Sequence, residues 1–174
     1  MVTATCPSAI FTSSLMSSIS ESIQAKCLAF SDRIIKLNDY LLEQAASRKS
    51  EGRSQKEDTR RGRTLTSSVL PLTSRVPVHL QSVAALANQL LRSGTSIGAN
   101  NAEACNAISK ADFKSKSFIA LKEARESLYW IDLLHRNAYL DDKQYNSIYS
   151  DCEELVKILV TRCKKINQEL DDKE

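Results

Sequence analysis

The side chains that could do chemistry are few and scattered along this sequence of 174 residues. Its two histidines, His79 and His135, lie in no E-x-x-H or H-x-x-x-H spacing that would place two metal ligands on one helix face. The five cysteines contain no C-x-x-C pair, so zinc and thioredoxin-type sites have no support. Because scattered cysteines in odd number are typical of a reducing compartment, we expect a cytoplasmic protein. The cysteines are Cys6, Cys27, Cys105, Cys152 and Cys163.

Motifs of the common enzyme classes are absent from the sequence. It has no G-x-x-x-x-G-K-[ST] phosphate loop, no G-x-S-x-G turn and no G-x-G-x-x-G dinucleotide motif. Glu103, Glu123 and Glu126 would come near one another if their helices align, and carboxylates on facing helices can bind iron or manganese. Without an E-x-x-H motif to complete such a site, we expect no enzyme, no metal and no cofactor.

The elements that must position these residues are helices. Apolar residues recur at alternating steps of three and four, the pattern of a helix with one buried seam, in four stretches. The seam positions are Ile23, Cys27, Phe30, Ile34, Leu37, Leu41 and Ala45; Val83, Ala87, Leu90, Gly94, Ile97, Asn101, Ala104 and Ile108; Phe113, Ser117, Ala120, Ala124, Ser127, Ile131 and Leu134; and Tyr145, Ile148, Cys152, Leu155, Leu159, Cys163, Ile166 and Leu170. No apolar run approaches the ~20 residues of a membrane span.

This pattern predicts an all-α protein, an antiparallel up-down four-helix bundle with a long insertion between its first two helices. We expect a disordered leader over 1–18 and a first helix over 19–46, capped by Ser20. A flexible, proline-containing insertion then covers 47–82, and 83–170 hold the other three helices.

The insertion carries most of the positive charge. Residues 47–64 hold seven basic and three acidic residues, a net charge of +4, whereas the remaining 17 basic and 18 acidic residues sum to −1. The basic members are Arg48, Lys49, Arg53, Lys56, Arg60, Arg61 and Arg63. Such a run is either a solvated tail or an arm that contacts phosphates.

The segment R-S-G-T-S-I-G-A-N, residues 92–100, is the most informative part of the second helix. Gly94 and Gly98 lie on one helical face, and each costs about 1 kcal/mol relative to alanine. Close approach of a neighbouring helix would compensate, while a kink near Ser93 and Ser96 or a phosphate site are the alternatives.

Polar residues near this segment predict contacts between helices. Asn101 lies on the seam, where it needs hydrogen-bond partners. We expect Arg92 to pair with Glu123 or Glu126 on the third helix and so to fix its register. An acid–base dyad is the rival interpretation.

Basic residues also gather on the third helix. Lys114, Lys116, Lys122 and Arg125 form either a solvated face or a basic stripe for nucleic acid. Aromatic residues that could stack bases are few, and we expect Tyr129 and Trp130 to be used in packing.

Three runs carry a family resemblance: QLLRSGTSIGANNAEA from Gln89, KADFKSKSFIALKEARESLYWIDLL from Lys110, and YLDDKQYNSIYSDCEELVKIL from Tyr139. They resemble the four helix bundle protein family, whose founding members are encoded by intervening sequences within bacterial large-subunit ribosomal RNA genes. The accessory variability determinant of diversity-generating retroelements is similar to this family as a distant relative.

The resemblance implies a homopentamer of four-helix bundles around a basic channel, and, for the retroelement relative, binding to RNA and to a reverse transcriptase. It implies packing and interface roles for the positions that match the family motifs. On the second helix these are Arg92, Ser93, Gly94, Thr95, Ser96, Gly98, Asn100 and Glu103; on the third they are Asp112, Phe113, Lys116, Ala120, Glu123, Ala124, Glu126 and Trp130. The long insertion departs from the short turn that is typical of the family.

Two functions are therefore expected. One is a non-enzymatic oligomeric scaffold that binds RNA, a nucleic-acid enzyme such as a reverse transcriptase, or both. The alternative is a self-assembling structural module with no nucleic-acid role. Salt-sensitive RNA binding separates the two.

Overall fold

A computed structural model describes residues 14–54 and 78–171, with side chains placed for 21–47 and 81–168. The described chain forms four helices and no strand: α1 (Ser14–Ser54), α2 (Val78–Cys105), α3 (Lys110–Arg136) and α4 (Asp142–Asp171). Each helix packs against its neighbours in chain order, and α4 closes against α1. The predicted all-α four-helix bundle is confirmed.

Short turns with capping residues join the last three helices. Ser109 is the N-cap of α3, where its hydroxyl accepts from Asp112 N at 3.1 Å and the Asp112 carboxylate accepts from Ile108 N at 3.2 Å. At the start of α4 the box is fully reciprocal, since Gln144 Oε1 accepts from Asp141 N at 3.1 Å and Asp141 Oδ1 accepts from Gln144 N at 2.8 Å. These boxes satisfy amide groups that a helix start leaves without partners.

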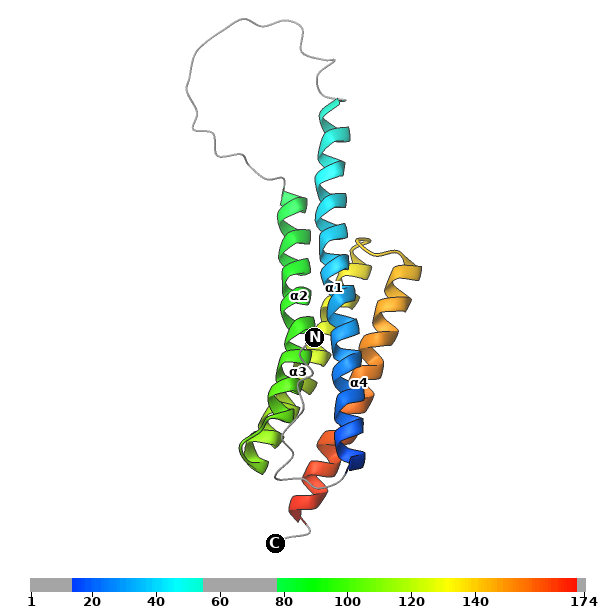
Figure 1. Cartoon of the computed structure of the whole chain (residues 1–174). Helices are drawn as coiled ribbons and strands as arrows, with labels where there is room; N and C mark the ends of the chain where they lie inside the picture. Colours follow the sequence, from blue (N-terminus) through cyan, green and yellow to red (C-terminus); the bar gives the residue numbers. More distant parts are fainter. Residues whose placement is uncertain (1–13, 55–77, 172–174) are drawn as a thin grey trace, which may run out of the picture.

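The buried core follows the predicted seams. All seam positions of α1 and α2 are buried except Leu37, which is half-buried, and Ile108, which is 86% exposed because α2 ends before it at Cys105. Figure 1 shows α1 and α2 running on together past the loop that joins α3 to α4. All four helices therefore contribute to the core over most of its length, whereas only α1 and α2 form it at one end.

The first helix is longer than predicted at both ends. It begins at Ser14, inside the predicted leader, and it ends at Ser54 rather than near Ala46, so Ser20 is not a cap. The charged residues after Ala46 are good helix formers, and a helix does not end merely because its apolar seam does. Likewise α2 begins at Val78, directly after Pro77, rather than at Val83.

Candidate nucleic-acid interface

The glycine pair of α2 faces α1. A Cβ added to Gly94 would meet Ile34 Cγ1 at 3.1 Å, and one added to Gly98 would meet Cys27 Cβ at 3.4 Å. The predicted close approach of a neighbouring helix is thus confirmed. A phosphate site at these glycines is wrong, because they lie in the middle of α2, where backbone amides are used by the helix itself.

The other polar residues of residues 92–100 stabilise α2 and its contact with α3. Ser127 Oγ of α3 donates to Ser93 Oγ at 2.9 Å between two buried hydroxyls. Thr95 Oγ1 donates to Leu91 O at 2.7 Å, and Asn100 Nδ2 donates to Ser96 O at 2.9 Å. Their contacts are those of packing residues, as the resemblance implies.

Asn101 is the centre of a polar network that joins three helices. It is fully buried, its amide donates to Gln24 Oε1 of α1, and its carbonyl accepts from Arg162 Nη1 of α4 at 2.7 Å. The Arg162 guanidinium also lies 5.9 Å from the centre of the Phe113 ring of α3. Burial lowers the pKa of Arg162.

The three glutamates do not converge. Glu103 forms an ion pair with Lys116, and Glu126 accepts from Trp130 Nε1 at 3.1 Å. Burial, followed by the neighbouring Glu126 carboxylate, raises the pKa of Glu123. Among the described side chains, no three histidine, cysteine, aspartate or glutamate residues could hold a metal ion.

The expected Arg92 ion pair is not formed. Arg92 is exposed, and the ion pairs between described residues do not include it, although it is near enough to Glu123 to lower the pKa of that carboxyl in part. Glu126, the other predicted partner, is used by Trp130 of its own helix. The described polar contacts between α2 and α3 are instead the Ser93–Ser127 hydrogen bond and the Glu103–Lys116 ion pair, beside the apolar core.

The described side chains offer no pair of nucleophile and base. His135 stacks on the Tyr145 ring at 4.1 Å and contacts Asp142 Oδ1 at 2.8 Å, where it ties α3 to α4. Burial raises the pKa of the Cys152 thiol to about 12, which suppresses its thiolate. A surface hollow of about 450 Å³ between α1 and α4 includes Arg33, which Asp151 engages, and Asp141, which caps α4.

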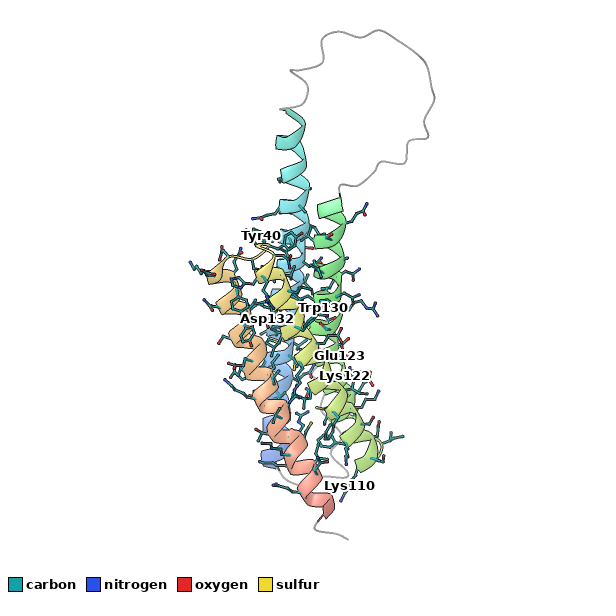
Figure 2. The ribbon with its side chains drawn as sticks, turned by 180° about the vertical axis from the view of Figure 1, so that it is seen from behind. Tyr40, Lys110, Lys122, Glu123, Trp130 and Asp132 are labelled. Atoms are coloured by element: carbon teal, nitrogen blue, oxygen red, sulfur yellow. The ribbon has the colours of Figure 1, made fainter. Side chains whose placement is uncertain are left out.

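Basic side chains collect on the outward side of α3. Lys122, Arg125 and Arg136 are exposed and Lys114 is half-buried, and none of the four is in an ion pair with another described residue. Lys114, Lys122, Arg125 and Arg136 are called the α3 basic face below. Figure 2 looks onto α3, with Lys122 labelled along it.

The four predicted nucleic-acid residues of the third helix do not all share this face. Lys116 lies on the side toward α2, where it pairs with Glu103, and this hydrogen bond and charge raise the pKa of Lys116. Arg136 belongs to the face but was missed by sequence reasoning. Its position, seven residues after Tyr129 and fourteen after Lys122, was the available signal.

Four of the seven basic residues that the insertion holds in 47–64 lie outside the described part of the chain. Arg48, Lys49 and Arg53 belong to the last turns of α1, while Lys56, Arg60, Arg61 and Arg63 lie outside the described residues. Their expected phosphate contacts stay a prediction. No helix in the described ranges is both long and apolar enough to cross a membrane.

The sequence profile of the 23S rRNA-intervening sequence protein family matches residues 57–161, more than half of the chain. The chain belongs to this family. It is also similar to a crystal structure of a protein of unknown function from the S23 ribosomal protein family of Bacteroides thetaiotaomicron, with 34% identity and a TM-score of 0.61, over 84% of this chain and 98% of that one. Curated proteins gave no match.

Proposed function

We propose that this protein is a non-enzymatic helical scaffold that binds RNA through the α3 basic face and associates with copies of itself. The observation that carries RNA binding is the set of four outward basic side chains on one helix, free of ion pairs with other described residues. Unneutralised cations in a row attract a phosphate backbone. The family name refers to 23S ribosomal RNA, which makes RNA the first ligand to test.

Charge reversal on the face tests this proposal. Lys122→Glu combined with Arg125→Glu should weaken RNA binding and flatten its salt dependence, by about 0.7 in the logarithmic slope for each lost contact with single-stranded RNA. The matched control is Lys36→Glu with Lys143→Glu, the same charge change at two exposed lysines of α1 and α4. Equal losses in the two double variants would mean that only net charge matters, and the α3 basic face would lose its role.

The basic residues of 48–63 are a second candidate for phosphate contact. Reversing all seven should lower RNA affinity further if they act as an arm. Unchanged RNA affinity would show that residues 48–63 do not contact RNA, and the α3 basic face would remain as the proposed site. A nucleic-acid enzyme such as a reverse transcriptase is the protein partner that the resemblance implies, and co-purification from the native host is the test.

Self-association is supported by an apolar stripe on the outside of α1. Leu28, Ile35 and Leu42 recur every seven residues and are 57%, 45% and 38% exposed. Ser31, one turn from Leu28, lies against Gly98 of α2, so the apolar stripe runs beside α2. The 28 residues of α2 hold only one lysine or arginine and one acidic residue, so few charges lie next to the stripe. Large apolar side chains that repeat on one outward face are typical of an interface between subunits.

Light scattering on a sizing column tests this second property. We expect an oligomer near five subunits, as the resemblance implies, and we expect Ile35→Asp to dissociate it. Ile108→Asp is the matched control, because Ile108 is 86% exposed in the turn between α2 and α3. A monomeric wild-type protein would contradict self-association without affecting RNA binding.

A further inference from the structure

Tyr129 is an exposed aromatic ring in the middle of the α3 basic face. Its side chain is 57% exposed, so the expectation that it is used up in packing is wrong. The ring packs edge-on against Trp130, with 4.9 Å between ring centres and 72° between ring planes. Trp130 is in turn held by its hydrogen bond to Glu126. Tyr129 thus rests against a hydrogen-bonded Trp130 ring while much of its own surface faces solvent.

Basic groups flank this ring along the helix. Arg125 precedes Tyr129 by one turn, Lys122 by two turns, and Arg136 follows it by two turns. Phe118 lies one turn before Lys122, but the Lys114 ammonium lies 5.9 Å from its ring centre, so that ring already has a cation beside it. Tyr129 is therefore the ring of this face that is best placed to receive a ligand.

The nearest carboxylates are engaged by other side chains. Glu126 accepts from Trp130, and Asp132 accepts from the Tyr145 hydroxyl at 2.8 Å. Figure 2 shows Asp132 and Trp130 at neighbouring levels of α3. The exposed charges around Tyr129 are hence the cations Arg125, Lys122 and Arg136. A neutral apolar partner would leave these cations unused, whereas a nucleic acid offers phosphates to them and bases to the ring.

We propose that the α3 basic face binds single-stranded RNA, with a base stacked on Tyr129 and with Lys122, Arg125 and Arg136 on the phosphates. This inference rests on the proposed function and names the form of RNA that the site takes. Stacking requires an unpaired base whose face is accessible, and the bases of a duplex are stacked on each other. Tyr129 should therefore contribute to single-strand binding alone.

Trp130 provides a direct measurement of such stacking. It is the sole tryptophan of the chain, and its ring touches Tyr129, so a base placed on Tyr129 should change the tryptophan fluorescence. The probe is an oligo-uridine of about 12 nucleotides, within the range of single-strand sites. An RNA duplex of the same length and buffer is the comparison. The full chain is titrated with each.

We expect tighter binding of the single strand. Tyr129→Ala should weaken it by at least about fivefold, Tyr129→Phe should retain it, and both should bind the duplex as the wild type does. Tyr40→Ala is the matched control, because Tyr40 is also exposed, at 37%, but belongs to α1. Circular dichroism establishes that each variant folds.

Two results would overturn the inference in different ways. Single-strand binding unchanged in Tyr129→Ala but lost in the Lys122 and Arg125 double variant would remove the stacking and leave the proposed function intact. No binding of either RNA by the wild type would overturn both.

Discussion

Gly94 of α2 lies directly against Ile34 of α1, with room for a hydrogen but not for an unhindered methyl group. A Cβ at Gly94 would lie 3.1 Å from Ile34 Cγ1 and 3.3 Å from Ile34 Cγ2. At Gly98 the nearest atom would be Cys27 Cβ at 3.4 Å, an ordinary contact. The close packing of α2 on α1 thus requires glycine more strictly at position 94 than at position 98.

The first prediction follows from that difference. Gly98→Ala should raise the free energy of unfolding by up to about 1 kcal/mol, because alanine favours the helix and meets no obstacle. Gly94→Ala should give little or no gain, and Gly94→Val should cost about 1–3 kcal/mol through overpacking. Urea denaturation measures all three.

A double-mutant cycle identifies the cause. Ile34→Ala removes both crowding atoms, so Gly94→Ala should become favourable in that background. The same effect of Gly94→Ala in both backgrounds would show that Ile34 does not limit this position.

The network around Asn101 predicts an asymmetric response to substitution. Asn101→Ala should lower the free energy of unfolding by about 2–4 kcal/mol, because Arg162 loses its acceptor while remaining half-buried. Asn101→Leu combined with Arg162→Met should cost less, since it leaves no charge without a partner. A double variant that is less stable than Asn101→Ala would contradict this account.

The raised pKa of Glu123 predicts a pH dependence of stability. Burial and Glu126 make the folded chain hold the Glu123 proton above the ordinary carboxyl pKa of 4.5. The folded state then binds more protons than the unfolded state, so stability falls as the pH rises through this range. Glu123→Gln mimics the protonated form, and its melting temperature should exceed that of the wild type increasingly from pH 4 to a plateau near neutrality. If Glu123→Gln melted at a higher temperature than the wild type only at acidic pH, the pKa of Glu123 would be shifted in the opposite direction.

Thiol alkylation should report the burial of the cysteines. Burial raises the pKa of Cys152 from 9.0 to about 12, which lowers its thiolate fraction at pH 8 about 1000-fold. Cys27, with its pKa raised to about 11, should be protected in the same way. Among the four described cysteines, half-buried Cys105 should react with iodoacetamide first, as mapped by mass spectrometry. If Cys105 and Cys152 were alkylated at equal rates in native buffer, and urea changed neither rate, burial would not be what protects Cys152.

The buried side of each helix was predictable from the sequence because apolar spacing records which face leaves water. Ile34, Leu90, Ile131 and Leu155 were all placed on seams and are all buried. Asn101 was also predicted as a buried polar residue that needs partners. Its partners, Gln24 and Arg162, come from helices distant in sequence, and no local pattern indicates which side chains meet across a core.

The sequence by itself therefore determined the helical class and the seams, and it favoured close approach of a neighbouring helix at Gly94 and Gly98 over a kink or a phosphate site. Only the tertiary structure decided that Arg92 stays without an ion partner among the described residues, that Lys116 turns to Glu103, and that Tyr129 faces solvent. The physical reason is that helical periodicity fixes the direction of a side chain about its own axis. The distance from that side chain to a neighbouring helix depends on how all four helices pack together.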